Sequence, residues 1–269
     1  MQKQYFCLLI IVLIFSKCSS AQSARFAGMG NSSLTLFDTW SATGNQAGLA
    51  NLEIATFAIG YENKFQLTET STQAAIIAFP SKSGNFALSL NRYGYHLYSE
   101  NSVGIAYARK LGEYISAALQ FDYLYYQQAA NYGNKNLFMM EAGLIAKPFD
   151  NFFIGAHIYN PTRVKLADYE QERVPTIMRF GLGYYFSNQV LFTVETEKNI
   201  YNKARFKAGI EYEPINHLFF RTGFGTNPNQ YSFGLGYEIW NFTTDIAVVT
   251  HEWLPLSTEI SISYSFKNN

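Results

Sequence analysis

The sequence predicts an all-β fold: a transmembrane antiparallel β-barrel of about 14 strands, plugged from the periplasmic side by an N-terminal segment. Three observations predict it. Apolar and polar residues alternate with a period of two along most of the chain. The connections between these stretches are short and long in turn. Aromatic residues make up 17% of the chain and charged residues only 15%, below the roughly 25% of soluble domains.

Residues 1–21 have the features of a secretory signal peptide. A lysine precedes an apolar run over residues 6–15, and small residues at 19–21 suit cleavage before Gln22. The run is shorter than the roughly 20 residues that a membrane-spanning helix needs. We therefore expect the segment to be removed rather than to remain as an anchor.

The two cysteines of the chain, Cys7 and Cys18, lie within this predicted signal peptide. Lys17 precedes Cys18, where a lipidation site favours a small residue, so we do not expect a lipid anchor. The mature chain would then have no disulfide and no thiolate site.

Residues 22–53 are rich in glycine, and we predict that they plug the barrel. Gly28 and Gly30 raise the possibility of a phosphate-binding loop, but no preceding strand, third glycine or Lys-Ser pair completes such a motif. A solvated linker is the other alternative. It would leave in water the apolar side chains of Met29, Leu34, Leu36, Phe37, Trp40 and Leu49.

Residues 54–269 are predicted to form the barrel as one domain. In YSFGLGYEI, residues 231–239, the aromatic and aliphatic side chains share one face, and serine, glycine and glutamate share the other. The same period occurs over residues 178–186, 205–212 and 258–266. The predicted strands cover residues 54–62, 72–79, 84–92, 101–109, 113–126, 137–147, 151–159, 176–186, 189–198, 204–213, 217–225, 231–240, 242–250 and 257–266.

A soluble β-sandwich or propeller would also show this alternation. It would have no reason to place aromatic residues repeatedly at strand ends, as at Tyr184, Phe186, Trp240 and Phe242. The aromatic girdles of an outer-membrane barrel explain this placement, and closure removes the sheet edges that lipid does not tolerate. We therefore expect a Gram-negative outer-membrane protein in contact with membrane lipid, with both termini in the periplasm.

The charged residues on the polar strand faces would line the lumen, and they are of mixed sign. They could form a polar pathway or ligand site, or an ion-paired network that fills and stiffens the barrel, which we favour. Glycines at 181, 183, 209, 223, 234 and 236 lie on the same faces and predict the close approach of another backbone or of a ligand inside the barrel. The candidate lumen-facing residues are Arg179, Glu195, Arg205, Lys207, Glu211, Arg221, Glu238 and Glu259.

No catalytic residue, metal site or cofactor is predicted. The four histidines, at 96, 157, 217 and 251, lie on different strands or loops without metal-ligand spacing. No Gly-x-Ser-x-Gly nucleophile motif accompanies them. Lysine plus arginine and aspartate plus glutamate number 20 each, so no charge surplus favours nucleic acid.

Two stretches resemble the outer-membrane superfamily that contains FadL-like long-chain fatty-acid transporters and PorV/PorQ-type barrels of the type IX secretion system. SARFAGMG, Leu36-Phe37-Asp38 and GNQAGLA resemble its N-terminal signature, with Gln46 where proline is usual. Residues 159–186 resemble the mid-barrel loop and strand of PorV/PorQ-type members. The residues of the plug motif are Gly28, Gly30, Asn45, Gln46, Ala47 and Gly48.

The resemblance implies fourteen strands, an N-terminal plug and a non-enzymatic function. An accessory role in type IX secretion, through contacts with secretion-machine proteins, is the first interpretation, favoured by the PorV/PorQ-like details and by a charge-rich loop at 160–175. Passive, FadL-like transport of a small hydrophobic ligand is the alternative. An apolar loop surface, or a hydrophobic pocket beside the plug, would favour transport.

Overall fold

The computed structural model describes residues 23–128, 134–166 and 173–266. The predicted signal peptide and both cysteines lie outside these residues. Fourteen antiparallel strands form a closed barrel in which each strand pairs with its neighbours in sequence and β1 pairs with β14. The strands are β1 Thr56–Asn63, β2 Ser71–Phe79, β3 Asn85–Gly94, β4 Tyr98–Lys110, β5 Ile115–Gln128, β6 Asn134–Phe149, β7 Phe152–Tyr159, β8 Ile177–Ser187, β9 Val190–Asn199, β10 Arg205–Ile215, β11 Leu218–Gly225, β12 Gln230–Ile239, β13 Phe242–Val249 and β14 Ser257–Ser265.

The predicted strands agree with these bounds within a few residues. The largest difference is in β6, which starts at Asn134 rather than 137 because Asn134–Asn136 continue the pairing with β5. These polar residues suggest a loop, but ladder hydrogen bonds do not depend on side-chain polarity.

The strands alternate apolar outward and small or polar inward. Along β12, Tyr231 and Phe233 are 56% and 62% exposed, whereas Ser232 between them is 1% exposed. This arrangement is the reverse of a soluble domain, in which the apolar face is buried. Within the described residues, no helix is long and apolar enough to cross a membrane.

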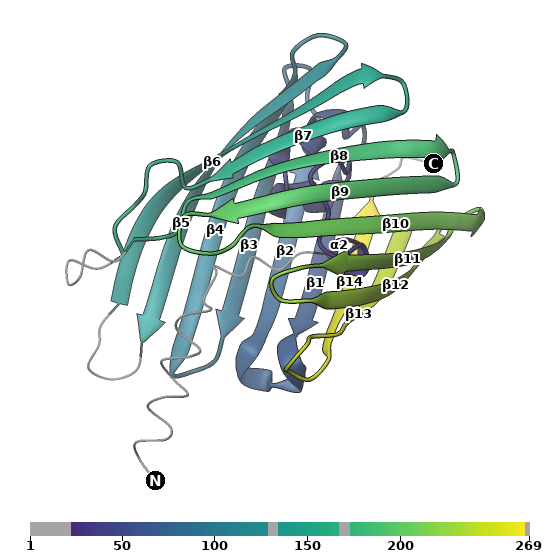
Figure 1. Ribbon diagram of the computed structural model, residues 1–269. Coiled ribbons are helices and arrows are strands. Elements are labelled where there is room, and N and C mark those ends of the chain that lie inside the picture. The colour runs from purple at the N-terminus through teal and green to yellow at the C-terminus, as the bar shows by residue number, and fades with distance from the viewer. Residues whose placement is uncertain (1–22, 129–133, 167–172, 267–269) are drawn as a thin grey trace.

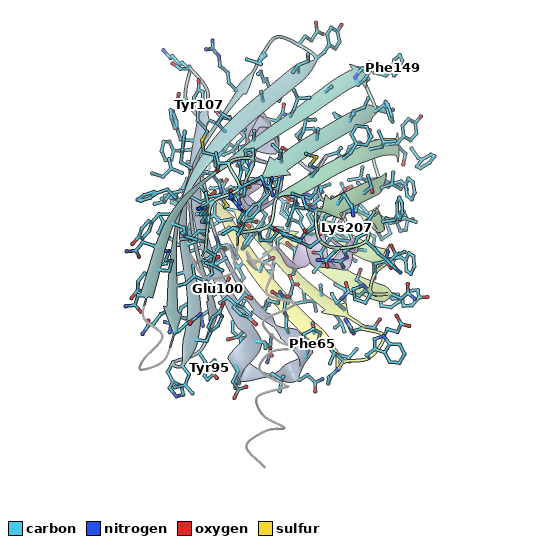
Figure 2. All side chains as sticks on the ribbon, turned by 60° about the vertical axis from the view of Figure 1, so that its left-hand side comes forward. Phe65, Tyr95, Glu100, Tyr107, Phe149 and Lys207 are labelled. Carbon is cyan, nitrogen blue, oxygen red and sulfur yellow. The ribbon has the colours of Figure 1, made fainter. Side chains whose placement is uncertain are left out.

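The two ends of the barrel differ. We call turn end the end with the short connections 80–84, 111–114, 150–151, 188–189, 216–217 and 240–241, and loop end the opposite one. Phe149 lies at the turn end and Phe65 and Tyr95 lie at the loop end (Figure 2). Two short 3-10 helices, η3 Lys64–Gln66 and η4 Thr68–Thr70, form the loop-end link between β1 and β2.

Aromatic rings gather on the outer surface near the turn end. Tyr184 packs against Phe186 at 4.9 Å between ring centroids, and Tyr264 lies 4.8 Å from Phe242 and 5.0 Å from Phe266. Trp240, at the turn between β12 and β13, is 84% exposed. Such a band of rings is typical of a membrane interface.

Residues 23–52, which we call the N-terminal segment, lie inside the barrel (purple in Figure 1). The segment contains α2 Ala24–Gly28 and two 3-10 helices, η1 Thr39–Thr43 and η2 Gln46–Asn51. Side chains of Ser23, Asp38 and Asn45 cap these three elements by accepting backbone N–H bonds. The caps satisfy backbone donors at the starts of these elements, which have no partner within the helix.

The inner wall is built of small residues where the N-terminal segment packs. Alanines on β1–β5, including Ala58, Ala87 and Ala106, form one apolar cluster with Trp40 and Leu49 of the segment. Alanine leaves room for helices, so η1 and η2 lie against this half of the wall while α2 lies against β11–β14.

Candidate functional site: the barrel lumen

Lumen-facing glycines receive the backbone of the N-terminal segment. A Cβ at Gly223 would collide with the Gly30 amide nitrogen, and one at Gly234 would lie 3.0 Å from Gly28 Cα. Gly209 meets the Met29 backbone in the same way. Gly181 and Gly183 instead lie against side-chain atoms of Leu34 and Thr35, and Gly236 faces Asp245 and Arg221. The predicted approach of a backbone is therefore confirmed at three of the six glycines.

Arg25 is the strongest polar link between the segment and the wall. Its Nε and Nη2 donate to the two carboxylate oxygens of Glu211 at 2.8 and 2.6 Å, and Nη1 donates to Asp38 at 2.8 Å. Burial opposes its charge, but Glu211 and Asp38 hold the pKa of Arg25 well above the ordinary value. A two-pronged pair of this kind fixes orientation as well as position.

The wall carboxylates and cations form a network beside Arg25. Arg221 donates to Glu211 at 2.6 Å and to Asp245 at 2.7 Å. Lys207, which lies inside the barrel in Figure 2, donates to Glu195 at 2.8 Å and to Glu197 at 2.7 Å. These side chains are ion-paired and buried, so this part of the lumen is a packed network rather than an open polar pathway.

The other predicted lumen residues lie apart from this network. Arg205 lies near the loop end and donates to the Thr226 carbonyl and to Gln230. Glu238 lies near the turn end, 3.5 Å from His217. Glu259 faces Glu62 across the β1–β14 pair.

Gln46 takes part in a second polar cluster with Glu141, His157 and Arg179. Its amide donates to Glu141 at 2.8 Å, and its oxygen lies 3.1 Å from His157 Nε2. Arg179 Nη2 lies 2.8 Å from His157 Nδ1, so Nδ1 accepts and Nε2 carries the proton, directed at Glu141. Proline at position 46, usual in the resemblance, would lack the side-chain donor used here.

Three further residues of the plug motif lie at the start of η2. Asn45 Nδ2 donates to the carbonyls of Leu34 at 2.8 Å and Leu144 at 3.2 Å, which ties segment to wall. Gly48 allows Leu36 and Ser41 to pack closely against it, because a Cβ at position 48 would overlap both residues. Ala47, fully buried, belongs to the apolar cluster around Trp40.

Two anchors were not predicted from the sequence. One is Arg25. Residues 23–52 contain two charged residues, Arg25 and Asp38, and this rarity could have identified Arg25 as an anchor. The other is Asn85, whose amide donates to the carbonyls of Leu49 at 2.7 Å and Leu52 at 2.8 Å. Asn85 begins a strand next to a turn, where nothing in the sequence distinguishes it.

The connection between β7 and β8 folds over the loop end of the lumen. Asn160 is fully buried, and its amide donates to the Val174 carbonyl at 2.7 Å while its oxygen accepts from the Val164 amide at 3.1 Å. These bonds close the base of the loop. Residues 167–172, the centre of the charge-rich stretch, lie outside the described residues.

This loop base brings apolar side chains into the barrel mouth. The resulting group, which we call the mouth cluster, consists of Leu124, Tyr126, Leu137, Met139 and Val174 with Tyr159, Val164 and Leu166 packed against it. The charge-rich sequence of 160–175 predicted only a polar loop here. The strand residues of the mouth cluster could have been predicted from the sequence. Leu124 and Tyr126 continue the alternation of inward-facing residues along β5.

A cavity lies between the mouth cluster and the N-terminal segment. Its volume is about 310 Å³, counting space that is open to solvent. Thr43 of η1 lies on its lining with residues of β3–β7, among them Gln120, Asp122 and Glu141. Among residues 23–128, 134–166 and 173–266, no group of three His, Cys, Asp or Glu could hold a metal ion.

Comparisons with known proteins identify the fold. No protein-family model matches the chain, and no curated protein sequence matches it. The structure is similar to the Ralstonia pickettii toluene transporter TbuX, with a TM-score of 0.73 and 12% identity over 91% of this chain and 98% of that one. It is also similar to the P. putida toluene transporter TodX, with a TM-score of 0.71 and 11% identity over 93% and 99% of the two chains.

A Pseudomonas aeruginosa FadL homologue gives a TM-score of 0.65 and 11% identity, over 93% of this chain and 99% of that chain. The chain therefore has the FadL-like outer-membrane barrel fold, and the predicted fold class is confirmed. Two of these three neighbours, TbuX and TodX, are toluene transporters. The finer likeness to PorV/PorQ-type secretion barrels has no counterpart among these three structures.

Proposed function

We propose that the protein is an outer-membrane channel for the passive uptake of a small, largely apolar solute. The mouth cluster carries the proposal. An apolar surface at the loop end, directly beside the cavity, is what a solute-capturing barrel needs. The similar structures are named for toluene transport and for FadL, which supports transport over the secretion-accessory interpretation.

The orientation that fits this function places the turn end in the periplasm. Short turns on the periplasmic side and longer loops outside are the rule for outer-membrane barrels. The mouth cluster would then face the exterior, and the N-terminal segment would act as a plug between it and the periplasm. A solute would have to displace part of this plug, or leave beside it.

Uptake by whole cells tests the proposal. Gram-negative cells that produce the protein are compared with cells carrying an empty vector for uptake of labelled toluene and of labelled glucose. We expect faster toluene uptake and unchanged glucose uptake, because the ion-paired lumen gives no wide water path.

Unchanged toluene uptake, with the folded barrel present in the outer membrane, would contradict the channel. Affinity purification in mild detergent covers the alternative. Recovery of secretion-machine subunits in stoichiometric amounts, without an effect on uptake, would restore the accessory role.

A further inference from the structure

The cavity below the mouth cluster presents hydrogen-bond acceptors that lack donors. Asn91 Oδ1, Gln120 Oε1 and Asp122 Oδ2 are buried and have no hydrogen-bond partner within the described part of the chain. All three residues lie on the cavity lining. Gln120 and Asp122 are 4% and 6% exposed, so bulk water does not solvate them freely.

The orientation of these groups is set by their neighbours. Gln120 Nε2 donates to Asp122 Oδ1 at 2.8 Å, which leaves the Gln120 oxygen and the second Asp122 oxygen for the cavity. Asn91 Nδ2 donates to Ser102 Oγ at 3.3 Å, so its oxygen is likewise the free end. Gly104 makes this arrangement possible, because a Cβ there would overlap Asp122, Ser89 and Gln120.

The charge of the cavity is negative. Asp122 and Glu141 both line it, and no lysine or arginine does. Glu141 accepts from Gln46 and His157, and Arg179 lies behind His157, whereas Asp122 accepts from Gln120 and lies beside Glu141, a second acidic side chain. Buried acceptors and an uncompensated carboxylate are unfavourable unless a ligand supplies donors and positive charge.

Apolar side chains line the same cavity beside these acceptors. Leu124 and Met139 lie on its lining and also belong to the mouth cluster, and Met139 pairs in register with Asp122. A ligand entering from the loop end would therefore meet apolar side chains and acceptors next to one another. The cavity is suited to a molecule with an apolar body and a donor-bearing, positively charged head.

We propose that this cavity binds the ammonium group of a small amphipathic amine. A protonated primary amine has three N–H donors, which matches the three free acceptors, and its charge pairs with Asp122. The inference rests on the proposed function in one respect, since it names the solute class of that channel. A plain hydrocarbon such as toluene has no donor and would pass without using these acceptors.

Binding to the purified full chain in detergent is the direct test. Butylammonium, 1-butanol and butanoate are titrated at neutral pH and followed by calorimetry. We expect butylammonium to bind at least tenfold more tightly than 1-butanol, and butanoate not to bind. Equal affinity for the amine and the alcohol would overturn the proposal and would leave ordered water as the occupant of the cavity.

Asp122→Asn removes the charge with little change of shape, and we expect it to weaken butylammonium binding at least tenfold. Asp150→Asn is the matched control, because Asp150 lies in the exposed turn between β6 and β7, and its affinity should equal that of the parent chain. If Asp122→Asn loses the heat-dependent gel shift of a folded barrel, Asn91→Leu replaces it, with a severalfold loss expected. Unchanged affinity in a folded variant would refute the site.

The outcome is separable from that of the transport proposal, because binding in detergent requires no passage. Butylammonium binding without any solute uptake by cells would contradict the channel and keep the site. Toluene uptake without butylammonium binding would contradict the site and keep the channel.

Discussion

At the residue scale, the outward apolar side chains and the inward charged side chains each suit a different environment. Leu235 on β12 faces outward at 44% exposure, where lipid tails replace water. Arg221 lies on the neighbouring strand β11, in register with Gly234; it faces inward and is paired with Glu211 and Asp245. Each residue type is stable only on its own face, because lipid solvates no charge and the lumen carboxylates need cations.

Leu235→Arg tests the facing at the lipid surface. We expect it to lower the free energy of unfolding by about 2–4 kcal/mol, the cost of arginine near the bilayer midplane. Denaturant unfolding of the protein in lipid vesicles measures the change. Leu254→Arg, the same substitution in the loop-end link between β13 and β14, is the control and should change stability by less than about 0.5 kcal/mol. Equal effects at the two sites would mean that Leu235 does not face lipid.

At the element scale, the N-terminal segment and the wall are shaped for each other. Alanines on β1–β5 accept the two 3-10 helices, and glycines on β8–β12 accept the turns between Gly28 and Thr35. Alternation within single strands is local, so the strands and their facing could be predicted from the sequence. The glycines also predicted a backbone inside, though not which residues it would bring to each strand.

Gly223→Val tests this fit. The added side chain would collide with the Gly30 backbone. It could not move away, because strand pairing holds the backbone of residue 223 in β11. We expect a loss of about 1–3 kcal/mol in stability, typical of overpacking, with faster proteolysis within residues 23–52. Gly225→Val on the same strand is the control, since its Cβ would have no neighbour closer than 3.9 Å. If both variants behave alike, the segment does not press on β11.

At the scale of the whole molecule, the fold was predictable and the lumen chemistry only in part. Periodicity and connection lengths indicated the barrel, because they repeat along the chain. The pairs that hold the segment join residues far apart in sequence, such as Arg25 and Glu211, and no local pattern encodes such a pair. The acceptor cavity is less predictable still, since it depends on which inward polar groups on β3–β7 remain without donors.

The segment as a whole determines whether the lumen conducts ions. Residues 24–50 fill the space between the alanine and glycine faces and also neutralise Glu211 through Arg25. Their deletion would leave a closed fourteen-stranded wall with charged residues such as Lys207 and Arg221 facing water, which is the condition for an ion-conducting lumen. We therefore expect clearly higher single-channel conductance in planar bilayers than for the full chain.

The Gly225→Val protein, reconstituted at the same density, should conduct as little as the parent and serves as the control for insertion. Heat-dependent gel mobility establishes that the deleted protein is still a barrel, since the lost packing against Trp40 and Leu49 lowers its stability. A folded deletion variant with the conductance of the parent would show that the strands themselves, rather than the N-terminal segment, close the lumen. That result would also mean that the N-terminal segment is not the barrier that the proposed solute has to pass.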